Sequence, residues 1–189
     1  AEDPRKVNTM LHNSALVEKL SGNQDDALRI FLEALSRHRA LGDFVGEALS
    51  LANLGLLYAE KGDLETASSY LRAGLDICDR HGFASTRVLI LANLTGLAIK
   101  TNDLASAEKY GKTALDIAQA TDNRHVISSV MVHFSRLALR RGDVERARAD
   151  LERGTYAAHV GAGSARRGER SREDGGPDRA RNHDHEALR

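Results

Sequence analysis

Apolar residues in the middle of the chain recur at the spacing of amphipathic helices. Two consecutive segments show this pattern, each with an apolar stripe on one side and polar residues on the other. The first stripe consists of Leu51, Leu54, Leu57 and Tyr58, and the second, in a helix that begins near Leu64 and ends before His81, consists of Ala67, Leu71, Leu75 and Cys78. We call the first helix of such a pair helix A and the second helix B.

A short polar turn separates helix A from helix B. Gly62 can adopt the left-handed conformation that closes a helix, and the side chain of Asp63 can accept hydrogen bonds from the first amides of the next helix. The same two signals recur as Asn102 with Asp103 and Gly142 with Asp143, and in a looser form as Gly22 with Asn23. The sequence therefore predicts four helix pairs.

The helix pairs follow one another at a fixed offset of 40 residues. Three sets of equivalent positions show this offset: an alanine early in helix B, a small residue in helix A, and a polar residue of helix A. They are Ala27, Ala67, Ala107 and Ala147; Ala15, Gly55, Thr95 and Ser135; and Asn13, Asn53, Asn93 and His133. Small residues let the two helix axes approach closely. Such self-similarity indicates stacked repeats that bury their apolar faces against their neighbours.

Composition narrows the class of protein. Of the 189 residues, 41% are hydrophobic but only 4% are aromatic, which suits closely packed helices. Lys and Arg together number 27, as do Asp and Glu, so no net charge attracts nucleic acid or an anionic membrane. No apolar run approaches the roughly 20 residues that span a bilayer. The single cysteine, Cys78, can form no internal disulfide, and we expect a packing role for it in a cytoplasmic protein.

We expect one all-α domain with a short segment before it and a different segment after it. An N-terminal extension (1–6) precedes four repeats over 7–160, at about 7–44, 45–84, 85–124 and 125–160. The first residues lack an initiator methionine and a secretion signal, which is consistent with a processed or excised fragment. The tail (161–189) has five Gly, seven Arg and one large apolar side chain. We expect it to be disordered or weakly helical.

The second helix pair resembles a tetratricopeptide repeat. That repeat has a leucine and a small residue in the middle of helix A, a tyrosine-type residue three positions later and an alanine early in helix B. Here these are Leu54, Gly55, Tyr58 and Ala67, and the resemblance extends from about Val7 to Val160. The period exceeds the usual length of about 34 residues. These long repeats are similar to those of the long-helix branch of the family. That branch includes kinesin light chain, Pins-type spindle adaptors, peptide-sensing regulators of Gram-positive bacteria and LuxR-type ATP-dependent transcription factors.

The resemblance implies a right-handed superhelical solenoid whose A helices line a concave binding face. We call Asn13, Asn53, Asn93 and His133 the asparagine ladder, because they occupy one turn of four successive A helices. An Asn amide can both donate to and accept from the backbone of an extended peptide. Members of the long-helix branch use an Asn at this position to hold peptide backbones. The alternative is that these side chains cap or bridge adjacent helices.

The residues that flank the ladder are mixed in character and suit an extended apolar or amphipathic segment of another protein. With the ladder, the predicted peptide-binding residues are His12, Leu16, Leu49, Leu56, Leu89, Arg136 and Arg140. Arg136 and Arg140 provide either a foothold for an acidic partner or a solvated end face. Chaperone-binding members of the family clamp a C-terminal carboxylate with Lys, Asn and Arg. The clamp positions here hold no cation, so we do not expect that ligand.

The sequence contains no phosphate loop, dinucleotide fingerprint, paired-cysteine metal site or nucleophile elbow. We therefore expect no enzymatic activity, no cofactor and no metal, but a protein-binding module that contacts neither nucleic acid nor membrane. Two alternatives remain open. The chain could be a sensor or scaffold segment of a larger bacterial transcriptional or signalling regulator. It could also form a homodimer through the fourth repeat, where Val144, Leu151 and Tyr156 would face a second chain.

Overall fold

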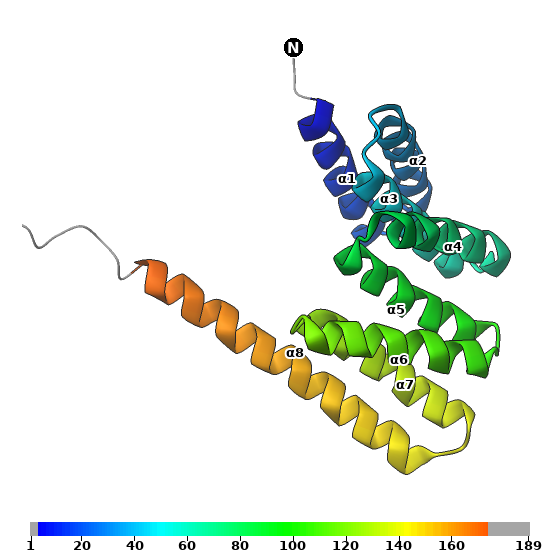
Figure 1. Ribbon diagram of the computed structural model, residues 1–189, viewed down its shortest axis with the longest axis vertical. Coiled ribbons are helices and arrows are strands. Elements are labelled where there is room, and N and C mark those ends of the chain that lie inside the picture. The colour runs from blue at the N-terminus through cyan, green and yellow to red at the C-terminus, as the bar shows by residue number, and fades with distance from the viewer. Residues whose placement is uncertain (1–3, 174–189) are drawn as a thin grey trace, which may run out of the picture.

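The computed structural model describes residues 4–173 of the chain and the side chains of residues 7–159. This part of the chain forms eight α-helices and no strands (Figure 1). They are α1 (Pro4–Leu20), α2 (Gln24–Ala40), α3 (Phe44–Lys61), α4 (Leu64–His81), α5 (Ala84–Lys100), α6 (Leu104–Ala120), α7 (Arg124–Arg140) and α8 (Val144–Glu173).

The helices stack as antiparallel pairs along one direction, from α1 and α2 at one end to α7 and α8 at the other (Figure 1). Each helix contacts the next along the chain, and the A helix α5 also contacts the A helices α3 and α7 directly. The A helices therefore form a continuous layer, and the B helices lie outside it. The all-α helical repeat fold predicted from the sequence is confirmed.

The turns within the pairs have the predicted geometry. Gly62 has a φ of 89°, in the left-handed region, and its amide donates to the carbonyl of Tyr58. Asp63 then begins α4 by accepting a hydrogen bond from the amide of Thr66 at 3.1 Å. Asp103 and Asp143 accept equivalent bonds at the start of α6 and α8. These local signals fix where each B helix begins.

Two turns differ in detail from the expected pattern. Asn23 makes no capping bond to α2 and instead donates to Glu18 at 2.7 Å, which fits its description as the looser copy. In the turn before α7, Asp122 takes the left-handed conformation with a φ of 47°. The next residue, Asn123, caps α7, where its side chain accepts a hydrogen bond from the amide of Val126 at 3.2 Å.

The two helices of a repeat approach closely where both carry small residues. Ala27, Ala67 and Ala107 are completely buried. At Gly55, a Cβ atom would lie 2.6 Å from Cγ of Leu71, far inside van der Waals contact. Leu71 of α4 can therefore pack onto the backbone of α3 only because position 55 has no side chain.

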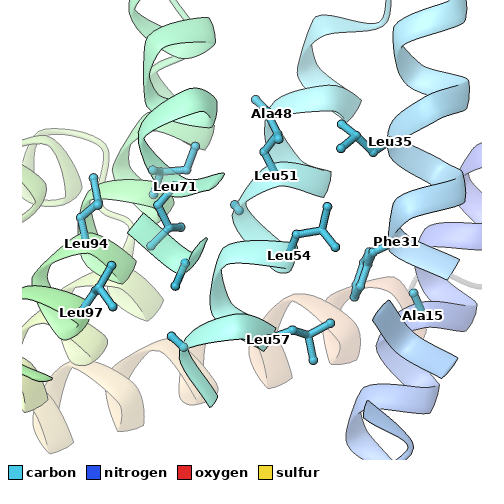
Figure 2. Packing of buried hydrophobic residues seen from close by; sticks show 14 of the residues in the cluster. Ala15, Phe31, Leu35, Ala48, Leu51, Leu54, Leu57, Leu71, Leu94 and Leu97 are labelled. Carbon is cyan, nitrogen blue, oxygen red and sulfur yellow. The ribbon is translucent and has the colours of Figure 1, made fainter. Parts of the chain in front are cut away.

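The core runs between successive repeats as well as within them. Figure 2 shows Leu54 and Leu57 on α3 directed toward Phe31 and Leu35 on α2. Leu54, Leu57 and Phe31 are completely buried. Each repeat thus covers the apolar side of the repeat before it, as expected for a stacked array.

Three further sequence predictions concern Cys78, the C-terminal tail and membrane-spanning helices. Cys78 is fully buried, and burial raises the pKa of its thiol to about 11, which leaves it a packing residue.

The last helix, α8, continues to Glu173, so the first part of the 161–189 tail has a helical backbone, and residues 174–189 lie outside the described region. None of the helices between residues 4 and 173 is long and apolar enough to cross a membrane.

We predict that Ala67→Leu lowers the free energy of unfolding by about 1–3 kcal/mol, because a larger side chain would force α3 and α4 apart. Ala73→Leu is the matched control, since it makes the same substitution at an exposed position of the same helix. It should change stability by less than about 0.5 kcal/mol. Urea unfolding followed by circular dichroism measures both. Equal effects of the two substitutions would contradict the close helix approach.

Candidate functional site

The asparagine ladder lies on the A-helix layer, with one residue on each of α1, α3, α5 and α7. Asn13 is exposed, whereas Asn53, Asn93 and His133 are half-buried. The partial burial arises because neighbouring A helices contact each other beside the ladder. The four side chains therefore occupy equivalent positions on one layer but differ in their surroundings.

Asn53 contacts the preceding repeat. Its Nδ2 donates to the carbonyl of Leu49 at 3.1 Å and lies 3.4 Å from Nε2 of His12 on α1. The His12 ring also packs edge-on against Phe31, with 5.5 Å between ring centroids. Burial, with the nearby His38, lowers the pKa of His12 and favours the neutral ring that can accept this contact. The amide nitrogen of Asn53 thus bridges adjacent helices, as in the alternative interpretation of the ladder. The amide oxygen makes no hydrogen bond within the described chain.

Asn13 and Asn93 differ from Asn53 in this respect. Neither side chain forms a hydrogen bond to another residue in the region that the structure describes. A half-buried amide such as that of Asn93 has a fixed position but retains its donors and its acceptor. These two residues are thus available for contacts with a ligand.

His133 occupies the fourth ladder position and leans against α5. Its ring lies over Gly96, where a Cβ atom would be 2.7 Å from Cε1 of the imidazole. Burial, followed by the charge of Arg136, lowers the pKa of His133 to about 4. Its Nδ1 atom is buried without a hydrogen-bond partner among the described residues. His133 is therefore a neutral ring at physiological pH, held by packing between two repeats.

The predicted leucines of the site are half-buried on the same layer. They are Leu16, Leu49, Leu56 and Leu89. Leu16 and Leu89 pack partly against the core, so part of each side chain remains accessible. These residues give the region around the ladder an apolar character in its first three repeats.

A cavity of about 370 Å³ lies between α5 and α7 at the end of this surface. It brings together the predicted residues His133, Arg136 and Arg140. It also includes residues that were not predicted as site residues: Gly96, Ile99, Lys100 and Leu139. One sequence signal could have found the cavity, because Gly96 stands where the first two repeats have Leu16 and Leu56. The remaining predicted residues are spread along α1, α3 and α5.

The cationic groups of this cavity are not neutralised by acids. Lys100 Nζ donates to the carbonyl of Ala59 at 2.8 Å, a neutral acceptor on α3. Arg136 and Arg140 are exposed and form no ion pair with any residue whose side chain the structure describes. The next residue, Arg141, by contrast pairs with Glu108 at 2.7 Å.

Comparison with known proteins finds one family match, over the first part of the chain. Residues 6–80 match the tetratricopeptide repeat family. A search of curated proteins finds no match. The fold is similar to that of BtubC (BKLC) from P. vanneervenii, with a TM-score of 0.67 at 18% identity, over 100% of this chain and 73% of that one.

Two further solved structures share the fold over shorter parts of their length. A STAND protein with a tetratricopeptide repeat sensor, from Pyrococcus horikoshii, has a TM-score of 0.65 at 23% identity, over 88% of this chain and 26% of that one. Aspartyl phosphate phosphatase F from Bacillus subtilis has a TM-score of 0.62 at 13% identity, over 82% of this chain and 50% of that one. At these identities the likeness shows the fold alone.

The burial of neutral His133 predicts a pH dependence of stability. Because its pKa is about 4 in the folded chain and about 6.5 when unfolded, the unfolded chain binds the proton first as pH falls. The free energy of unfolding therefore decreases as the pH falls from about 6.5 to about 4. On account of His133, it should be about 2 kcal/mol lower at pH 5 than at pH 7.

The comparison variant is His133→Asn, which restores the residue of the other three repeats. It should reduce the stability difference between pH 7 and pH 5 by about this amount in denaturant titrations. His125→Asn, at an exposed histidine of the same helix, is the control and should not reduce the difference. A wild-type pH dependence that persists in His133→Asn would contradict the buried neutral ring.

Proposed function

We propose that this chain, a tetratricopeptide repeat protein, is a non-catalytic cytoplasmic module that binds a segment of another protein along its A-helix layer. The observation that carries the proposal is the asparagine ladder. Two of its amides, on Asn13 and Asn93, and the amide oxygen of Asn53 make no hydrogen bond within the described chain. Polar groups placed at equal intervals on one layer suit a ligand that is itself a repeating polymer.

The spacing of the ladder fits an extended peptide. Neighbouring helices pack about 10 Å apart, and an extended chain advances about 3.3 Å per residue. One ladder residue can therefore contact the ligand backbone at roughly every third residue. Between these contacts, the half-buried Leu49, Leu56 and Leu89 offer apolar surface to ligand side chains. We infer a ligand segment that is extended or amphipathic and carries apolar residues.

As an alternative version of this proposal, the chain is a sensor or scaffold segment of a larger regulator. It then binds its ligand on the same A-helix layer. The fold similarity to the STAND protein from Pyrococcus horikoshii, whose repeats are described as a sensor, supports this version of the proposal. In that version, ligand binding on the repeats acts on a flanking domain. An ATPase or winged-helix domain next to these repeats in the full-length protein would decide for it.

Self-association is a second candidate function, favoured by the exposed side of α8. Leu151 is 50% exposed, whereas Phe31 and Leu71 at the equivalent positions of the first two repeats are 0% and 1% exposed. Val144 and Tyr156 are also exposed, and Tyr156 lines a cavity of about 450 Å³ between α7 and α8. An apolar surface of this kind could pack against a second copy.

We predict that Asn93→Ala weakens peptide binding without destabilising the fold. Loss of one backbone contact should reduce affinity by about 0.5–1.5 kcal/mol, while the melting temperature should stay nearly unchanged because the amide has no partner in the described chain. Peptides selected from a random displayed library on the wild-type protein provide the ligand, and fluorescence anisotropy gives the affinity. Gln119→Ala, at an exposed position of the B helix α6, is the control and should bind as the wild type.

The opposite pattern would assign Asn93 a structural role. An Asn93→Ala variant that melts several degrees lower but binds the selected peptides with wild-type affinity contradicts the proposal at this position. Asn53→Ala is expected to show both effects, since its amide nitrogen contacts α1 and its oxygen is unpaired.

Sedimentation velocity over a range of protein concentrations tests self-association. If α8 mediates it, the wild type should show concentration-dependent association that Leu151→Ser abolishes. Leu32→Ser is the control, because Leu32 is a partly exposed leucine of the B helix α2. A wild-type protein that stays monomeric at all concentrations eliminates this second function.

A further inference from the structure

The electrostatic character of the A-helix layer changes from one end to the other. Two sets of equivalent positions, one and two turns after the ladder, show the change along the four repeats. They read Leu16, Leu56, Gly96 and Arg136, and Leu20, Glu60, Lys100 and Arg140. The first two repeats are thus apolar with one acid, and the last two are cationic.

The acid in the first half is already neutralised. Glu60 forms an ion pair with Lys19 of α1 at 3.1 Å, so neither charge is left to attract a ligand. In the second half, Lys100 contacts only a main-chain carbonyl, and Arg136 and Arg140 have no acidic partner in the described region. At these two sets of positions, the charges without an acidic partner therefore lie at the C-terminal end of the layer.

The cations surround a cavity rather than a flat surface. The ring of His133 on α7 packs directly on Gly96 of α5, a position that carries a leucine in each of the first two repeats. Lys100, Arg136 and Arg140 line the same cavity together with the apolar Ile99 and Leu139. The three positive charges repel one another, so each of them makes the unpaired state of the other two less favourable in free energy. An anionic group that enters would relieve this repulsion and receive charge-assisted hydrogen bonds.

We propose that this cavity binds carboxylate side chains of the partner segment, so that the ligand has an apolar part and an acidic part. The inference rests on the proposed function, because the cavity is continuous with the ladder through His133. Two repeats separate the apolar surface at Leu16 and Leu56 from the cavity, a span of about 20 Å. The apolar and acidic parts of an extended ligand should then lie about six residues apart.

The lining of the cavity favours a protein ligand over a nucleic acid. No phenylalanine, tyrosine or tryptophan lines it, so nucleobases have no such ring to stack on. The whole chain has no net positive charge to attract a polyanion. The apolar walls at Ile99 and Leu139 instead fit the methylene groups of an aspartate or glutamate side chain.

The test uses the whole chain and a displayed library of random peptides. Peptides selected on the wild type should be enriched in Asp and Glu on one side of an apolar cluster. For a selected peptide, replacing its Asp and Glu by Asn and Gln, or replacing the receptor residues in Arg136→Gln with Arg140→Gln, should each weaken binding about tenfold or more. Combining both changes should cost little more than either alone, because they remove the same interaction.

The matched control is Arg72→Gln with Arg148→Gln. These two exposed arginines lie on the B helices α4 and α8, so the control removes the same charge from elsewhere on the molecule. It should bind the selected peptide within about twofold of the wild type if the cavity, not overall charge, is responsible. An equal loss in both double variants would overturn the inference.

Other outcomes separate this inference from the proposed function. Selected peptides that depend on Asn93 but show no acidic enrichment, and bind Arg136→Gln with Arg140→Gln normally, overturn the carboxylate site and leave the proposed function standing. Failure to select any peptide rejects both. Stronger displacement of the peptide by inorganic phosphate than by acetate, at equal ionic strength, would show that the cavity prefers phosphate and would overturn the assignment to carboxylates.

Discussion

The close approach of the two helices within each repeat is the constraint on which the rest of the structure depends. Leu71 packs directly onto the backbone at Gly55, and Ala67 lies fully buried one turn earlier in α4. This contact places helix B behind helix A in the second repeat, and the small residues at the equivalent positions of the other repeats allow the same close approach, so the A helices come together as one layer. A larger residue in the contact would change the tilt of helix A and disturb the spacing of the side chains it presents.

The regular layer explains why a site can be built from equivalent positions. Contacts between neighbouring A helices join residues that lie 41 residues apart, one more than the period, such as His12 with Asn53 and Ala59 with Lys100. Where the repeats keep the same residue, as with the first three ladder positions, the layer presents a periodic polar surface. Where one repeat departs from its neighbours, as at Gly96, the layer opens into a cavity. The proposed recognition of an extended partner depends on both properties.

The fold could be predicted almost entirely from the sequence, whereas the site could be predicted only in part. The period, the turn signals at Gly62 and Asp63, and the small residues of helices A and B are all local and specify the helix pairs directly. Asn53 and His12 are 41 residues apart in the sequence, and their contact depends on how α1 and α3 are aligned. The neutral state of His133 likewise depends on Gly96 of the preceding A helix. Neither relation is visible in a single repeat.

The central claim is that the partner lies along the A-helix layer. Backbone amide chemical shifts of isotope-labelled protein, recorded with and without one selected peptide, test it most directly. The account predicts shift changes on α3, α5 and α7 around Asn53, Asn93 and Gly96, with α4 and α6 largely unaffected. Changes confined to the B helices, or to α8 around Tyr156, would contradict it.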